Sequence, residues 1–432
     1  MVVTMTRRET LREQKRESAE AMLSALPAPE GESGWAREMR ARARARLLEA
    51  GAPIRRDEYW RFTDPTPLTT PLRVVEAGEA GETALPFADQ NPALVRFVNG
   101  RHRADLSADS AGEGVAMATL SEILSQDISV FRDLFGVLET AGNEKVDRPL
   151  AILNTATATE GLVLQVTGQV KQPIHIRYDQ NGEGAALIRH LIRVEKGAEV
   201  TVLESGIASN TVLEAEVEEG AVLHHIRVQT GPREPHATHL FAKLHANAQF
   251  KTFTLTADGE LTRNEIVMDL VGDHGSGHIA GAILGKGSAH LDNTIFVTHT
   301  AEHCESRQVF KSVLTERSTS AFQGKIFVRP GAQKTDAYQL SQSVLLDDGA
   351  EFLVKPELEI HADDVACSHG STTGGLDPTA MFYLRSRGVP HDEAETMLIA
   401  AFADEAIAEI ADETLADLMR DEVSRWMAAR HG

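Results

Sequence analysis

A thiol and an imidazole lie two positions apart in the stretch DDVACSHGSTTGGLD, which runs from Asp363 to Asp377. Cys367 is one of only two cysteines in the 432-residue chain, and His369 follows it after one serine. Thiolate and imidazole are ligands for zinc, copper or iron, and they also form the nucleophilic pair of cysteine hydrolases. Because residues i and i+2 of a strand share a face, the two side chains can act together if this stretch is a strand.

The second cysteine lies in HTAEHC, which contains His299, His303 and Cys304. A structural zinc site needs four ligands and an all-cysteine cluster site needs four thiolates, which two cysteines do not supply. One hypothesis is a mononuclear metalloenzyme of cupin-like β type that uses His299, His303 and Cys367. A hydrolase built on Cys367 and His369 is the other, but it lacks a recognisable oxyanion hole and an orienting acid.

The glycine-rich stretch GSGHIAGAILGKGS, residues 275–288, does not match a phosphate-binding loop. Lys286 is followed by Gly287 rather than Ser or Thr, and the spacing from Gly281 is one residue short. The stretch also lies among predicted strands rather than between a strand and a helix. We therefore expect no ATP site in this chain.

The charge of the chain disfavours two classes of partner. The sequence has 43 basic and 64 acidic residues and a net charge of −21, so phosphate backbones and anionic lipids repel it. No apolar run approaches the roughly 18 residues of a membrane helix. Residues 1–26 are charged throughout, unlike a secretory signal. These features predict a cytoplasmic protein with two reduced thiols that binds neither nucleic acid nor membrane.

The chain divides into three regions by composition. Residues 1–150 are predicted to form a mostly helical N-terminal domain that includes a helix over 35–50. Residues 151–376 alternate apolar and polar residues in short runs typical of strands. Residues 377–432 are predicted to be helical, with Asp377 as the N-cap of a helix that stops at Gly388. This small bundle has too little apolar surface to stand alone, so it must lean on the strands or on a partner.

A turn signal recurs through the strand region, where a residue tolerant of positive φ precedes an alanine. It occurs at Gly197-Ala198, Gly220-Ala221, Asn247-Ala248, Gly331-Ala332 and Gly349-Ala350. The recurrence favours a solenoid of stacked strands, and a β-sandwich or cupin-like barrel is the competing interpretation. Aromatic residues make up only 5% of the chain, which suits narrow coils filled by aliphatic side chains.

One block, KPELEIHADDVACSHGSTTGGLDPTAMFYLRSRG at 355–388, resembles the C-terminal signature of the SufB/SufD family, in the form found in its SufD branch. RRDEYWRFTD, LVRFVNGRH, ILNTATATEGLVLQV and GKIFVRPGAQKTDAYQ are similar to other family segments, so the resemblance runs from about residue 53 to 410. Ser368 and Gly370 replace the acidic residues that flank the SufB histidine. Ser371 and Ser341 or Ser343 are conservative departures from the family pattern.

The resemblance implies a fold and partners. The family belongs to the SUF machine for iron–sulfur cluster assembly, and it implies a right-handed parallel β-helix core flanked by N- and C-terminal helical domains. It implies pairing with SufB through the β-helix and binding of the ATPase SufC through the C-terminal helices. The chain itself is then a non-enzymatic subunit. The residues expected to contact SufC are Asp377, Phe382, Tyr383, Arg385, Arg387, Leu398 and Phe402.

The resemblance also assigns the opening pair. His369 matches the family histidine implicated in nascent cluster assembly at the SufB interface, and Cys367 matches the cysteine beside it. We expect His369 to be a ligand for iron or a forming cluster that is bound transiently in the complex, with no cofactor held tightly by the isolated chain. The alternatives are the metalloenzyme above and a purely structural β-helix homodimer in which neither side chain has a role.

Overall fold

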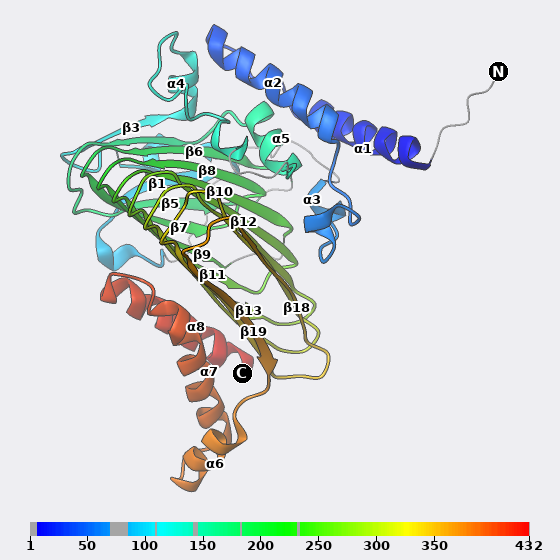
Figure 1. The fold of residues 1–432 in the computed structure, drawn as a ribbon, viewed down its shortest axis with the longest axis vertical. Helices are drawn as coiled ribbons and strands as arrows, with labels where there is room; N and C mark the ends of the chain where they lie inside the picture. Colours follow the sequence, from blue (N-terminus) through cyan, green and yellow to red (C-terminus); the bar gives the residue numbers. More distant parts are fainter. Residues whose placement is uncertain are drawn as a thin grey trace.

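The computed structural model describes residues 7–69, 85–108, 110–140, 146–181, 184–230 and 234–431. Residues 163–374 form a β-solenoid of about seven turns, in which two sheets face each other (Figure 1). Each strand pairs in parallel with the strand two places along the chain, which is the connectivity of a solenoid. The predicted solenoid is therefore confirmed, and the sandwich and barrel interpretations are wrong.

The strands alternate between the two sheets along the chain. The first sheet contains β5 (Ile174–Asp179), β7 (Glu199–Gly206), β9 (Val222–Gln229), β11 (Gln249–Ala257), β13 (Ser276–Gly285), β15 (Glu305–Leu314), β17 (Asp336–Leu345) and β19 (Ala366–Gly374). The second contains β4 (Leu162–Val166), β6 (Leu187–Val194), β8 (Asn210–Val217), β10 (His236–Leu244), β12 (Leu261–Leu270), β14 (His290–His299), β16 (Thr319–Val328) and β18 (Glu351–Ile360).

Strands from the N-terminal region cover the first turn. β1 (Ala93–Val98) pairs in parallel with β5, β2 (Arg101–His102) pairs with β1, and β3 (Val115–Thr119) pairs antiparallel with β4. The region expected to be mostly helical thus extends both sheets of the solenoid. Its α-helices are α1 (Arg7–Ser24), α2 (Gly34–Ala50), α3 (Thr66–Thr69), α4 (Leu120–Ser125) and α5 (Pro149–Thr157), and the boundary expected at residue 150 falls inside α5. The described residues of this region also include the 3-10 turns η1 to η4, at Glu58–Trp60, Ala88–Gln90, Ala104–Leu106 and Leu138–Thr140.

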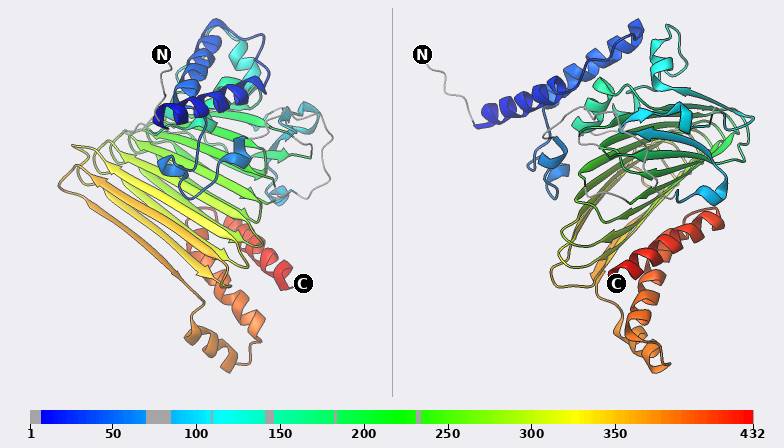
Figure 2. Two further views of the ribbon diagram at one scale, coloured as in Figure 1. Left: turned by 90° about the vertical axis from the view of Figure 1, so that its right-hand side faces the viewer. Right: turned by 180° about the vertical axis from the view of Figure 1, so that it is seen from behind.

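Three helices follow the solenoid: α6 (Pro378–Ser386), α7 (His391–Ile407) and α8 (Glu413–His431). Figure 2 shows them on the side of the molecule away from α1 and α2. α7 and α8 pack on the outer face of the first sheet, which confirms that the C-terminal helices lean on the strand region. The buried contacts include Ile226, Phe253 and Val309 from the sheet and Ile399, Met419 and Trp426 from the helices. None of the helices in the described part of the chain is long and apolar enough to cross a membrane.

One corner of the solenoid accounts for three of the five predicted turn pairs, at Gly197, Gly220 and Asn247. Gly331-Ala332 lies in the same kind of loop but ahead of the corner position, and Gly349-Ala350 lies between β17 and β18, where Gly349 does not have a positive φ. Successive turns place a residue with φ between 55° and 69° at this corner, and a small buried residue follows it. The first residues are Gly197, Gly220, Asn247, His274, His303 and Lys334, followed by Ala198, Ala221, Ala248, Gly275, Cys304 and Thr335. The backbone N–H of His303 donates to the carbonyl of Gln333 in the next turn at 2.9 Å, and the other corners repeat this bond.

Cys304 is therefore a small residue of the corner. Its side chain is 1% exposed, and its Sγ donates to the carbonyl of Gly272 at 3.3 Å. Burial raises the pKa of the thiol, which keeps it protonated. The adjacent His303 lies outside on the exposed corner, where its ring stacks on His274 with centroids 4.8 Å apart.

The interior of the solenoid contains neutral histidines. His299 is fully buried, and its Nε2 lies 2.8 Å from Ser306 Oγ. Burial lowers the pKa of His299 to about 3. Burial also lowers to about 4 the pKa values of His190 and His236 in the interior, and of His175, which lies on the outer face of the first sheet against Phe87. These histidines therefore stay neutral in the folded chain at pH values somewhat below 6.5, where a free imidazole, with a pKa of about 6.5, is mostly protonated.

We expect the corner to tolerate Cys304→Ala and to resist a larger residue. Alanine occupies the equivalent position in three earlier turns, so Cys304→Ala should change the free energy of unfolding by less than about 1 kcal/mol. Cys304→Leu overfills the corner and should cost about 1–3 kcal/mol. Urea unfolding curves measure both, and equal destabilisation by the two substitutions would contradict this account of the corner.

We also expect the solenoid to lose stability as the pH falls from about 6.5 to about 4. In this window the unfolded chain binds protons on histidines that stay neutral in the folded chain, so the free energy of unfolding rises with pH. The slope approaches about 1.4 kcal/mol per pH unit for each such histidine. Carboxylates such as Glu216, whose pKa His245 and nearby cations lower to about 2, add their own loss only below about pH 4.5.

The variant His299→Gln tests the contribution of one histidine. Glutamine can keep a hydrogen bond to Ser306 but does not titrate, so the variant should show a shallower pH dependence of unfolding than the wild type. Urea midpoints measured from about pH 7.5 down to about pH 4.5, a range that brackets the ordinary imidazole pKa, give the two slopes. Identical slopes would show that folding does not lower the pKa of His299.

Candidate functional site

The solenoid ends in an open turn. β18 and β19 are the last strands of the two sheets, and within the described residues each pairs with a strand on one side only. Side chains on β18 are mostly half-buried, whereas inner strands such as β16 are almost fully buried. Ile360, at the end of β18, is 39% exposed. The last turn therefore presents two unpaired strand edges and a partly uncovered interior.

Cys367 and His369 both face the interior side of this open turn. Cys367 is the register partner of Ala337, and His369 is the register partner of Gln339 on β17. Ala337 and Gln339 are each 1% exposed inside the solenoid, and parallel strands keep register partners on one face. The predicted strand thus places both side chains on the same face. Cys367 is half-buried, but His369 is exposed because no further turn covers it.

The environment of Cys367 keeps its sulfur protonated. Burial, followed by the nearby Asp336 carboxylate, raises the pKa of the thiol. A nucleophilic cysteine needs the opposite, a cationic neighbour or helix N-terminus that lowers the pKa. The hydrolase hypothesis therefore has no support in the surroundings of this residue. A bound metal ion would displace the thiol proton, so coordination in a completed site stays open to Cys367.

The ligand set of the metalloenzyme hypothesis is not assembled. His299 is buried inside the solenoid at the end of β14, His303 lies on the exposed corner, and Cys367 lies on β19. In the parts of the chain that the structure describes, no group of three or more His, Cys, Asp or Glu side chains is placed to hold a metal ion. Sequence proximity misled here because the chain turns the corner between His299 and His303.

The open turn has one polar wall and one apolar wall. On β19, His369 is followed by Ser371 and Thr373, and these accept hydrogen bonds from Ser341 at 3.4 Å and Ser343 at 2.7 Å. On β18, Phe352, Val354 and Leu358 pack against the buried core with part of their surface uncovered. An imidazole thus lies beside apolar surface that another chain can cover.

The residues predicted to contact SufC fall into two groups. Asp377 caps α6, where its Oδ1 accepts a hydrogen bond from the Thr379 N–H at 2.8 Å. Phe382 and Tyr383 project from α6 and are 74% and 57% exposed. Arg385 is exposed on the same helix, and the Arg387 guanidinium lies 5.3 Å from the centre of the Tyr383 ring.

The two α7 residues of that prediction take part in packing within the chain. Leu398 and Phe402 are half-buried, and Phe402 packs against the apolar cluster between α7 and the first sheet. The Nζ atom of Lys311 on β15 lies 4.8 Å from the centre of the Phe402 ring and also pairs with Glu405. Met397 of α7, which the sequence analysis did not select, is more exposed than Leu398 and Phe402, at 47%.

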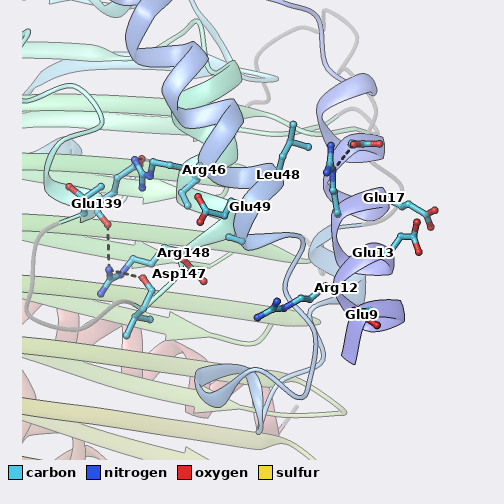
Figure 3. A pocket seen from close by; sticks show the side chains of 16 residues that line it. Glu9, Arg12, Glu13, Glu17, Arg46, Leu48, Glu49, Glu139, Asp147 and Arg148 are labelled. Carbon is cyan, nitrogen blue, oxygen red and sulfur yellow. Dashed lines mark hydrogen bonds and ion pairs between the residues drawn. The ribbon is translucent and has the colours of Figure 1, made fainter. Parts of the chain in front are cut away.

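A large hollow lies away from the open turn. It is a groove of about 1260 Å³ between α1, α2 and the chain before α5, and its lining is mostly charged (Figure 3). Several of these charges pair with one another, such as Arg46 with Glu139 at 3.1 Å and Arg16 with Glu20 at 3.1 Å. Figure 1 places α1 and α2 at the opposite end of the solenoid from β19.

Comparison with known proteins agrees with this architecture. Residues 176–402, just over half of the chain, match the family described as SUF system FeS cluster assembly, SufBD core domain. The iron-sulfur cluster assembly protein SufD of Escherichia coli is 29% identical over 382 residues, 85% of this chain and 88% of that protein. A SufBD family protein of Synechocystis, slr0076, is 28% identical over 86% of this chain and 87% of its own length. SufD of Bacillus subtilis is 27% identical over 62% of this chain and 64% of its own length. The chain is thus a SufD-like member of the SufBD family of the SUF system for iron–sulfur cluster assembly.

Proposed function

We propose that this chain is the SufD-type subunit of a SUF assembly scaffold, which pairs with SufB, binds the ATPase SufC and supports cluster formation at the SufB interface. The observation that carries the proposal is the open last turn, where an exposed imidazole projects from β19, one of two edge strands that no described strand covers. In this proposal ATP hydrolysis belongs to SufC.

The strand edges suit pairing with another solenoid. The outer edges of β18 and β19 present backbone N–H and C=O groups that a strand of a second chain can satisfy. The half-buried apolar residues of β18 add surface that such pairing would remove from water. In the proposal SufB is the physiological partner, and a second copy of this chain takes its place when SufB is absent.

His369 is the proposed contribution of this chain to the iron or forming cluster. A neutral imidazole is a good iron ligand, and the position of His369 leaves it accessible from the open end. A single imidazole with one adjacent thiol does not complete a site, so the remaining ligands would come from SufB. We therefore expect the isolated chain to purify without tightly bound metal, and the metal or cluster is cargo of the complex.

The SufC contact is proposed on α6. Two exposed aromatic side chains with arginines beside them form the kind of surface that dominates binding energy at interfaces. Deleting residues 377–432 would not test this contact cleanly, because α7 and α8 also cover the outer face of the first sheet. Point substitutions on α6 leave that packing in place.

We expect His369→Ala to leave the fold and the complex intact and to lower cluster assembly in cells by at least about tenfold, because even the loss of an outer-shell partner of a metal ligand costs about 10–100-fold in metal affinity or activity. His361→Ala is the matched control, because His361 is an exposed histidine of the same turn that contacts Phe327 and Glu359. The activity of an iron–sulfur enzyme supplied by this system measures the effect. Normal enzyme activity in the His369→Ala strain would remove the proposed role.

We expect Phe382→Ser combined with Tyr383→Ser to weaken SufC binding by more than about tenfold, since buried aromatic anchors at interfaces typically contribute about 2 kcal/mol or more each. Pairing with SufB should be unchanged. Ile128→Ser is the control, because Ile128 is 90% exposed and belongs to the N-terminal region. Co-purification of SufC with each variant is the measurement, and undiminished SufC recovery with the double variant would place the contact elsewhere.

A further inference from the structure

Inside the solenoid, a chain of hydrogen-bonded polar side chains leads toward the open turn. His299 Nε2 lies 2.8 Å from Ser306 Oγ, and Ser306 Oγ accepts from Gln308 Nε2 at 3.1 Å. Gln308 Oε1 in turn accepts from Gln339 Nε2 at 3.4 Å. All four residues are at most 1% exposed. The two glutamines thus form an amide ladder between successive turns.

His369 occupies the next position of this ladder. Gln308 on β15 is the register partner of Gln339 on β17, and Gln339 is the register partner of His369 on β19. The three side chains therefore project from the same face of consecutive strands. In the existing step, the Nε2 atom of Gln339 donates to the Oε1 atom of Gln308, one turn earlier. The equivalent donor for Gln339 would come from its register partner on β19, which is His369.

The Oε1 atom of Gln339 is the open position in the ladder. Among the described residues it has no hydrogen-bond partner, although it is buried. A buried carbonyl oxygen without a donor costs free energy, so an available donor should satisfy it. The His369 side chain is exposed and free to change rotamer, whereas its neighbours on β17 are held in the packed interior.

The second sheet leaves space for the Gln339 amide, because the residue that faces it is a glycine. Gly324 of β16 lies opposite, and a Cβ atom at this position would lie 2.1 Å from Gln339 Nε2 and 2.7 Å from its Cδ. Any other residue at position 324 would therefore displace the amide. The location of the amide is thus set by two independent features, the ladder bond to Gln308 and the missing side chain at Gly324.

We propose that Gln339 is a positioning residue for His369. Its Oε1 accepts a hydrogen bond from one ring N–H of His369, which selects one tautomer of the neutral imidazole. The other ring nitrogen then carries the lone pair and faces away from Gln339, toward the open end where a metal would approach. The inference rests on the proposed function of His369 as an iron ligand, but the proposed hydrogen bond requires no partner and can be tested in the isolated chain.

The test reads the tautomer of His369 directly. Full-length chain labelled with ¹⁵N in its histidine rings is studied by NMR at about pH 8.5, where an ordinary imidazole with a pKa of about 6.5 is neutral. The His369 signals are those that disappear in His369→Ala. We expect Gln339→Met, which keeps the side-chain length but removes the acceptor, to change the tautomer ratio about two- to tenfold, the range for one net hydrogen bond.

Two further variants make the result specific. Gln339→Glu retains an acceptor, so it should keep the wild-type tautomer and move the ring N–H proton downfield. Ser341→Ala removes a different polar contact between β17 and β19 and should leave the His369 ratio unchanged. An unaltered ratio in Gln339→Met, or an equal change in Ser341→Ala, overturns the proposal.

A folding defect in Gln339→Met does not leave the question open, because an unchanged His369 N–H shift in Gln339→Glu also overturns the proposal. The NMR reading requires no cluster, SufB or SufC. Its failure is therefore distinguishable from failure of the proposed function, which the cellular assay of His369→Ala tests separately.

Discussion

The backbone hydrogen bonds between each strand and the strand one turn later are the constraint on which the rest of the structure depends. They fix a register in which residues about thirty positions apart in sequence, such as Gln308, Gln339 and His369, become neighbours. The same bonds must stop where the chain leaves the solenoid. In the last turn the side chains therefore face inward as in the earlier turns, but no further turn covers them. The strand edges and these inward-facing side chains are available to another chain.

Register also decides which residues have a structural role. The corner column requires a left-handed residue and then a small buried one, which accounts for His303 and Cys304 without any chemistry. The interior column that holds Gln308 and Gln339 ends at His369, where the same position becomes exposed. Two cysteine–histidine pairs that look similar in the sequence, His303 with Cys304 and Cys367 with His369, thus lie in different structural environments. One belongs to the corner of an inner turn, and the other lies on the open turn.

Much of the fold followed from local sequence, because glycine or asparagine before alanine reveals a corner of the solenoid. The corners at His274 and His303 could not be recognised in this way, since non-glycine residues rarely adopt positive φ and give no signal. In the loop before β17 the signal was found at Gly331-Ala332, but the corner position itself is Lys334. The shared face of Cys367 and His369 was predictable from their spacing. The part played by Gln339 was not, because its relation to His369 depends on a register between strands that no local pattern specifies.

Burial was the second property that local sequence left undetermined. Phe382 and Phe402 are both aromatic residues of predicted helices, yet only the first is strongly exposed. The difference arises because α7 lies on the first sheet, where Phe402 contacts Lys311, whereas α6 extends beyond the sheet. A helix whose own apolar face is weakly defined cannot indicate which residues a distant sheet will cover.

The position of α6 bears on how the proposed partners would communicate. Only residues 375–377 separate the end of β19 from the start of α6. The next helix, α7, is held on the first sheet by the ion pair of Lys311 with Glu405. The turn that follows α7 is held by His278, whose Nδ1 lies 2.9 Å from Glu409. A force applied to α6 by a bound ATPase would therefore meet a fixed helix on one side and the unsupported edge strand on the other. The edge strand is the more compliant of the two, because among the described strands it has a hydrogen-bonded neighbour on one side only. In the proposed complex, movement of SufC would consequently act on the strand that carries His369 before it disturbs the solenoid core.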